Sequence, residues 1–163
     1  MLKEKYQELI NLLVKEIKSF YQERLISIVL FGSVARETQR FDSDIDLLIV
    51  VKDLPKGRLK RTTEFMEIEE KIEEYLKSLE KIGINTYISP VLKTPEEVKM
   101  GSPLFLDLVE EAQILYDKED FFKKELEKLK EKLKSLGAKR YWLGNAWYWV
   151  LKPDIKPGET IKL

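Results

Sequence analysis

Two short apolar runs constrain the fold of this chain more than any other feature of its sequence. Residues 25–31 read LISIVLF and residues 45–51 read IDLLIVV, so both runs are rich in β-branched and aliphatic side chains. Each run has the length of a strand that is buried on both faces. Residues 32–44 between them are mostly polar and begin with Gly32-Ser33, which leaves room for one helical turn and a loop. The pattern predicts two core strands joined by a short polar connection.

Helical periodicity surrounds these two strands. Apolar side chains three and four residues apart predict amphipathic helices over residues 2–22 and 58–80, the second ending at Gly83. The run INTYISPVL predicts a third strand over residues 84–92. The later elements that we expect are a helix capped by Thr94-Pro95-Glu96-Glu97, a helix after Pro103, a strand over 113–117 and a helix over 118–136 closed by Gly137. Strands that alternate with helices predict an α/β or α+β fold, with a small mixed sheet flanked by helices.

The length of 163 residues fits one domain with a small appendage. We assign residues 1–117 to the principal domain, and residues 118–163 to a C-terminal helix with an aromatic-rich extension packed on the same domain. The extension holds all three tryptophans of the chain. One interpretation is a stacking platform for a nucleobase or single-stranded nucleic acid. The other, which we favour, is a strand or hairpin that buries the rings against the core or a second copy of the chain.

Composition excludes several kinds of chemistry. The chain has no cysteine and no histidine, which rules out disulfides, Cys- or His-ligated zinc and a Ser-His-Asp triad. Lys plus Arg and Asp plus Glu each number 29, and this balance argues against a general polyanion binder. Lys and Glu predominate among the charged residues, a bias typical of hyperthermophile proteins. No run approaches the roughly 18 apolar residues of a membrane span, and the N-terminus lacks a signal-peptide core, so we expect a cytoplasmic protein without membrane contact.

A pair of aspartates carries the strongest functional signal. Asp44 and Asp46 are two residues apart, so in an extended chain they project to the same face. Adjacent carboxylates repel unless a cation lies between them, and oxygen ligands suit Mg²⁺. Gly32 permits close approach of the backbone to an anion, and Ser33 adds a hydroxyl at the start of a helical turn. A lone D-x-D is more often a solvated loop, but here Asp46 leads directly into the apolar residues 47–51.

These residues resemble the DNA polymerase β-like nucleotidyltransferase superfamily, and most closely its minimal nucleotidyltransferase branch. The family pattern G-S-x-A-R-G…S-D-I-D-L is matched by GSVAR and SDIDL, while Glu37 stands where the family usually has glycine. The resemblance implies transfer of a nucleoside monophosphate, AMP from ATP, to a protein or small-molecule acceptor. It implies that Gly32 and Ser33 hold the phosphates, and that Asp44 and Asp46 are catalytic and bind Mg²⁺, in the family two ions. Arg36 would neutralise phosphate charge, or else form a surface ion pair with a neighbouring acid.

One departure from the family pattern concerns catalysis. Active members usually carry a third carboxylate on a later core strand, but residues 84–92 contain no acid. We expect one of Asn85, Tyr87 or Ser89 to face the aspartate pair, with Asn85 as the first position at which to restore an acid. Transfer by such a site should be slow, unless the acceptor or another acid such as Glu96 or Glu97 supplies the missing group. The alternatives to an enzyme are a weakly active or inactive module that binds nucleotide or a partner, as an antitoxin binds its toxin, and an RNA-binding protein.

Overall fold

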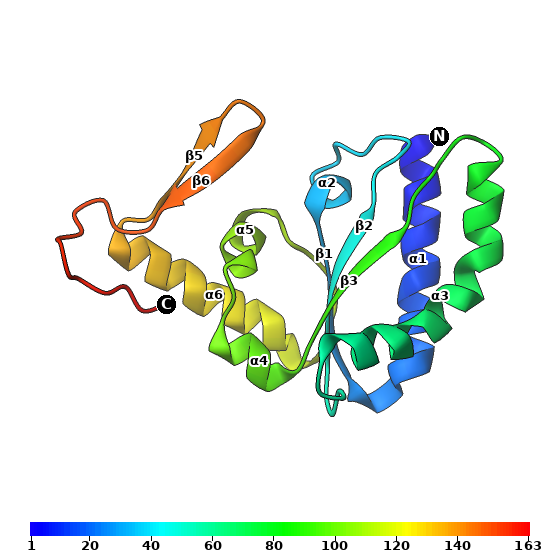
Figure 1. The fold of residues 1–163 in the computed structure, drawn as a ribbon, viewed down its shortest axis with the longest axis horizontal. Coiled ribbons are helices and arrows are strands. Elements are labelled where there is room, and N and C mark those ends of the chain that lie inside the picture. The colour runs from blue at the N-terminus through cyan, green and yellow to red at the C-terminus, as the bar shows by residue number, and fades with distance from the viewer.

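A four-stranded mixed sheet forms the centre of the molecule. The computed structural model describes residues 1–163, and its sheet has the order β3–β2–β1–β4 (Figure 1). The strands are β1 Leu25–Phe31, β2 Ile45–Val51, β3 Ile88–Lys93 and β4 Gln113–Asp117. Strand β1 pairs antiparallel with β2 and β4, whereas β2 pairs parallel with β3. The mixed sheet flanked by helices is the architecture that the sequence predicts.

Helices α1 (Leu2–Tyr21) and α3 (Arg58–Glu80) cover one face of the sheet (Figure 1). Side chains that alternate along β2 determine which residues meet them. Ile45, Leu47 and Ile49 join the larger buried cluster together with the apolar stripes of both helices. The tripeptide Gln22–Arg24 forms a short 3₁₀ turn, η1, which leads from α1 into β1.

Helices α4 (Pro95–Met100), α5 (Leu104–Glu111) and α6 (Phe121–Leu136) lie on the other face, where Leu48 and Val50 of β2 are buried. A second 3₁₀ turn, η2 (Lys118–Asp120), leads from β4 into α6. The buried Ser27 hydroxyl donates to Asp117 Oδ1 at 2.7 Å. The same carboxylate oxygen accepts the backbone N–H of Phe122 at 2.9 Å, which caps the first turn of α6. None of the helices combines the length and the apolar character that a transmembrane span requires.

The third strand begins later than predicted. The expectation of a strand from residue 84 is wrong for residues 84–87, and the backbone N–H groups of the first two of them bond away from β2. The Ile84 N–H donates to Leu79 O at 2.9 Å and closes the end of α3, and the Asn85 N–H donates to Phe41 O at 2.8 Å. The ladder with β2 starts where the Ile45 N–H donates to the carbonyl oxygen of Tyr87 at 3.0 Å.

The C-terminal extension is a separate two-stranded hairpin. Strands β5 (Lys139–Leu143) and β6 (Ala146–Val150) pair antiparallel and project beyond the end of α6 (Figure 1). A hairpin, one of the two predicted forms, is therefore present. Its rings are not fully buried against the core of this chain, and their burial against a second copy stays a prediction. Trp142 is 56% exposed and Tyr148 is 51% exposed. The rings stack on each other across the hairpin instead, with Tyr141 and Tyr148 stacked at 5.6 Å between centroids.

Candidate functional site

The aspartate pair lies at the start of β2, beside the end of β1. Asp46 is the second residue of β2 and pairs with Phe31, the last residue of β1. Gly32 follows at once and begins the four-residue helix α2 (Gly32–Ala35). The strand pairing thus brings together Gly32, Ser33 and the two carboxylates, as the sequence predicts. Polar residues come together here because the apolar residues on either side fix the register of both strands.

Only glycine fits at position 32, because the Asp46 side chain packs against the Cα of Gly32. Its φ is +78°, and a Cβ at this position would collide with Asp46 Oδ2. The Asp46 carboxylate therefore occupies the space that any larger residue at position 32 would fill. Gly32 was expected to permit close approach of a bound anion. In the structure the group closest to it is the Asp46 carboxylate, and the contact with a phosphate stays a prediction.

The environment of Asp46 disfavours its charged form. Burial raises the pKa of Asp46 above its usual value, and the neighbouring charge of Asp44 raises it further. The charge of Arg36 and a hydrogen bond from Ser89 act in the opposite direction without cancelling the rise. Additional positive charge beside the two aspartates would favour their ionised forms, and a divalent cation would supply it.

Strand β3 and the residue before it, Tyr87, add hydroxyl groups to the site. Ser89 pairs with Asp46 across the parallel ladder. The Asp44 carboxylate raises the pKa of the Tyr87 hydroxyl, by accepting its hydrogen bond and by its charge, so the two groups lie close together. The expectation that β3 faces the pair is confirmed, but the residue opposite Asp46 is Ser89. The expectation that Asn85 opens the strand is wrong, because Asn85 precedes β3 and its backbone N–H bonds to Phe41 O, so Ser89 replaces it as the first position at which to restore an acid.

The structure supplies no third carboxylate at this end of the sheet. No group of three or more acidic side chains gathers in an arrangement that could hold a metal ion. Glu97 caps α4 through Thr94 and forms an ion pair with Arg61 at 2.7 Å. Because β2 and β3 run parallel, residues that follow β3 lie at the far end of the sheet from Asp46. Neither Glu96 nor Glu97 therefore supplies the missing acid. The oxygen donors present suit Mg²⁺, with the remaining ligands to come from substrate phosphates.

A buried tyrosine on α1 anchors the loop before Asp44. The Tyr6 hydroxyl donates toward the carbonyl oxygens of Arg40 and Ser43, at 2.9 and 2.7 Å. The Ser43 hydroxyl in turn accepts the backbone N–H of Arg40 at 2.8 Å. Sequence reasoning treated Tyr6 only as part of an apolar stripe. Nothing in the local sequence links it to a loop more than thirty residues away.

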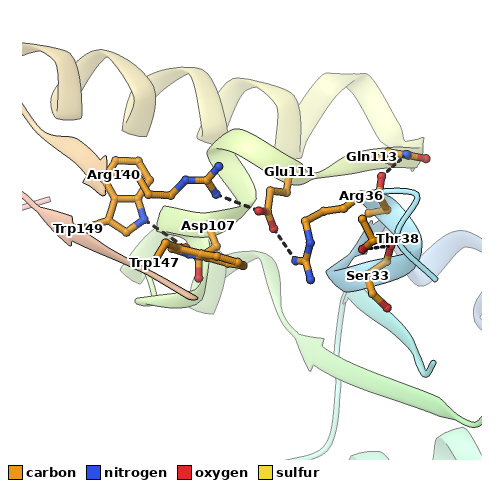
Figure 2. Close-up of polar contacts among 10 residues, drawn as sticks. Ser33, Arg36, Thr38, Asp107, Glu111, Gln113, Arg140, Trp147 and Trp149 are labelled. Atoms are coloured by element: carbon orange, nitrogen blue, oxygen red, sulfur yellow. Dashed lines mark hydrogen bonds and ion pairs between the residues drawn. The ribbon is translucent and has the colours of Figure 1, made fainter. Parts of the chain in front are cut away.

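Arg36 lies just after α2, and its ion pair reaches α5. Its Nη1 is 2.9 Å from Glu111 Oε2, and its charge lowers the pKa of Asp46. Figure 2 shows Glu111 between Arg36 and Arg140 of the hairpin, and Arg140 Nη1 lies 2.9 Å from Glu111 Oε1. The ion pair expected as one interpretation of Arg36 is therefore present, and its role toward phosphate stays a prediction. Sequence reasoning missed Glu111.

Comparison with known sequences identifies a protein family and two relatives of this chain. A sequence model of the family described as nucleotidyltransferase domain matches residues 10–105, which include both aspartates and the Gly32-Ser33 turn. MJ1305 of Methanocaldococcus jannaschii, named as a candidate protein adenylyltransferase, is 36% identical over 125 residues, 76% of this chain and 80% of that protein. MJ0141 of the same organism, named in the same way, is 37% identical over 54 residues, 33% of this chain and 54% of that protein.

Solved structures that can be superposed on this chain have lower sequence identity to it than these relatives have. A crystal structure of a toxin–antitoxin pair with AMP-PNP contains a chain that is 19% identical, with a TM-score of 0.45, covering 78% of this chain and 91% of that one. A structure of the tri-AMPylated HEPN toxin of Shewanella oneidensis in complex with an MNT antitoxin gives 15% identity and a TM-score of 0.42. That match covers 84% of this chain and 93% of the other.

Proposed function

We propose that this chain, which belongs to the nucleotidyltransferase domain family, transfers AMP from ATP to a hydroxyl group on a protein, with Mg²⁺ held by Asp44 and Asp46. The acceptor oxygen would form a bond to the α-phosphorus of ATP as the bond to pyrophosphate breaks, and the acceptor proton would pass to solvent or a nearby base. The observation that carries the proposal is the packing of the Asp46 carboxylate against Gly32, with Asp44 beside it. The name of the 36% identical relative supports AMP as the group and protein as the acceptor.

The residues around Asp44 and Asp46 would have separate roles in such a site. Gly32 and Ser33 begin a helical turn whose first N–H groups have no side-chain cap, so they suit the phosphates of ATP. Arg36 would offset phosphate charge at the same end of the sheet. When bound, Mg²⁺ would supply the charge that stabilises the transferring phosphoryl group and the leaving pyrophosphate.

Calorimetry of Mg·ATP binding tests the proposed metal site. We expect Asp44→Asn combined with Asp46→Asn to abolish Mg²⁺-dependent ATP binding while the circular dichroism spectrum of the fold persists. Asp42→Asn is the matched control, because Asp42 lies in the same loop with a side chain that is 73% exposed. The same Mg·ATP affinity in the double variant and in wild type would overturn the assignment.

A second candidate function is a nucleotide-binding partner module with little transferase activity, and the absence of a third acid favours it. Incubation with labelled ATP and Mg²⁺ separates the two. An enzyme labels an acceptor, and Ser89→Asp should raise its rate, because a positioned base typically contributes about 10²–10⁴-fold. A chain that binds Mg·ATP but transfers no label, with or without Ser89→Asp, would be a binding module.

RNA binding has less support from the hairpin. A single-strand platform combines exposed rings with free cations along the backbone path. Here Arg140 forms an ion pair with the mostly buried Glu111, and Lys152 forms one with Glu159. Two of the cations beside the aromatic rings are therefore already paired with acids within the chain.

A further inference from the structure

One carboxylate on α5 is shared by two arginines from distant parts of the chain. Each oxygen of Glu111 is 2.9 Å from one guanidinium group, Oε2 from that of Arg36 and Oε1 from that of Arg140 (Figure 2). The Glu111 side chain is only 8% exposed. A carboxylate that is largely removed from water needs charged hydrogen-bond donors to remain ionised. Glu111 therefore holds both guanidinium groups in place.

Trp147 of β6 fixes the same cluster from the side. Its ring centroid lies 5.2 Å from the guanidinium carbon of Arg36 and 5.1 Å from that of Arg140. Its indole N–H donates to Asp107 Oδ1 at 2.5 Å. A ring that contacts two guanidinium groups attracts both through its electron-rich faces. The hairpin thus reaches Arg36 through an ion-pair network and through an aromatic contact.

The charge of this cluster matters for a phosphate ligand. Arg36, Glu111 and Arg140 together carry one net positive charge. If Arg140 were absent, Glu111 would form its ion pair with Arg36 alone and neutralise it. If Glu111 were absent, the long Arg36 side chain would lose its anchor and its fixed direction. Both arginines are therefore needed for an ordered positive charge near Asp46.

We propose that Glu111 and Arg140 are positioning residues that hold the Arg36 guanidinium at the nucleotide site with a net positive charge. The C-terminal hairpin is then a functional part of triphosphate binding, although it lies outside the residues that match the family. This inference rests on the proposed function, because it takes Arg36 as a contact for the ATP phosphates.

A double-mutant cycle on Mg·ATP affinity tests the coupling. We expect Arg140→Ala to weaken Mg·ATP binding by about three- to tenfold when Arg36 is present, and by less than about twofold in an Arg36→Ala background. Glu111→Gln, which is nearly isosteric, removes the anchor of Arg36 but raises the net charge of the cluster, so its effect on Mg·ATP affinity, whatever its sign, should fall below about twofold in the Arg36→Ala background. Near-ultraviolet circular dichroism of the tryptophans reports whether the hairpin persists. If Arg140→Ala loses this signal, the Glu111→Gln cycle decides.

Lys139→Ala is the matched control, because it removes one positive charge from the adjacent position of β5. Neighbouring residues of a strand point to opposite faces, so Lys139 does not face Glu111. Equal effects of Arg140→Ala and Lys139→Ala, or equal effects of Arg140→Ala in both backgrounds, would overturn the coupling alone. A wild-type chain that does not bind Mg·ATP would overturn both the coupling and the proposed function.

Discussion

The molecule contains two antiparallel strand pairs that are held by different forces. In the pair β1–β2, every residue from Leu47 to Val51 is buried, and helices cover both faces. In the pair β5–β6 no residue is buried, and its rings stack mainly on one another. An isolated two-stranded hairpin is marginal in water, so β5–β6 depends on a few polar contacts with Asp107 and Glu111 of α5. Burial fixes the register of the first pair, and these anchors fix the position of the second.

The largest expected difference comes from a matched pair of leucines. Leu48 of β2 is fully buried, whereas Leu143 at the tip of the hairpin is 74% exposed. We expect Leu48→Ala to lower the free energy of unfolding by about 2–5 kcal/mol, because it removes buried methyl groups and leaves a cavity. Leu143→Ala should change it by less than about 0.5 kcal/mol. Chemical denaturation measures both, and similar costs would contradict the comparison.

The glycines that follow β1 and β5 give the next largest difference. Gly32 and Gly144 both have positive φ, at 78° and 64°, but only a Cβ at position 32 meets another atom within 4 Å. We expect Gly144→Ala to cost about 1 kcal/mol of unfolding free energy from backbone strain, and Gly32→Ala about 2–4 kcal/mol from strain and overpacking.

A second substitution isolates the steric term at position 32. The carboxylate that a Cβ would meet belongs to Asp46. In an Asp46→Ala background, Gly32→Ala should therefore cost little more than Gly144→Ala. An unchanged cost in that background would show that the collision is not what distinguishes the two glycines.

Loss of the contacts that hold the hairpin to α5 should leave the stability of the central sheet unchanged. Asp107 Oδ1 accepts the indole N–H groups of Trp147 and Trp149, at 2.5 and 3.1 Å. Asp107→Ala should reduce the local opening free energy of the hairpin by about 1–3 kcal/mol, measured by amide hydrogen exchange of β5 and β6. Exchange in β1 and β2 should not change. Glu110→Ala, an exposed neighbour on α5, serves as the control, and loss of protection throughout the sheet would contradict the separation.

The smallest expected effect is electrostatic and lies at the site end of β2. Burial and Asp44 raise the pKa of Asp46 in the folded chain, so folding favours its protonated form. Its ionisation therefore destabilises the metal-free fold as pH rises through the folded pKa. We expect Asp46→Asn to increase the free energy of unfolding at neutral pH by less than about 1 kcal/mol. The gain should disappear once the pH falls below the ordinary range of an aspartate, where wild type is protonated in both states. Thermal unfolding from neutral to acidic pH without Mg²⁺ measures it, and a gain that grows toward low pH would contradict the sign.

Sequence reasoning succeeded where the signal is local. The bounds of β1 and β2, the turn at Gly32 and the common position of Asp44 and Asp46 follow from apolar runs and residue spacing. It failed at residues 84–87, where the backbone N–H groups of Ile84 and Asn85 bond to the end of α3 and to the loop at Phe41. Glu111 and Tyr6 were missed for the same reason, since their partners are distant in the chain. The sequence left open whether the rings of the hairpin are exposed or covered, because aromatic content alone does not determine what covers a ring.

Pro90 in the edge strand β3 bears on how the molecule behaves in crowded solution. Since the Tyr87 carbonyl faces β2, alternate residues along β3 turn their backbone toward β2, and Pro90 turns outward. The free edge therefore lacks an N–H in its middle, so a strand from another molecule cannot form a continuous ladder there. The opposite edge strand, β4, spans only Gln113–Asp117. The β3 edge thus resists strand addition, which lowers the risk that so aliphatic a sheet aggregates edge to edge at high concentration.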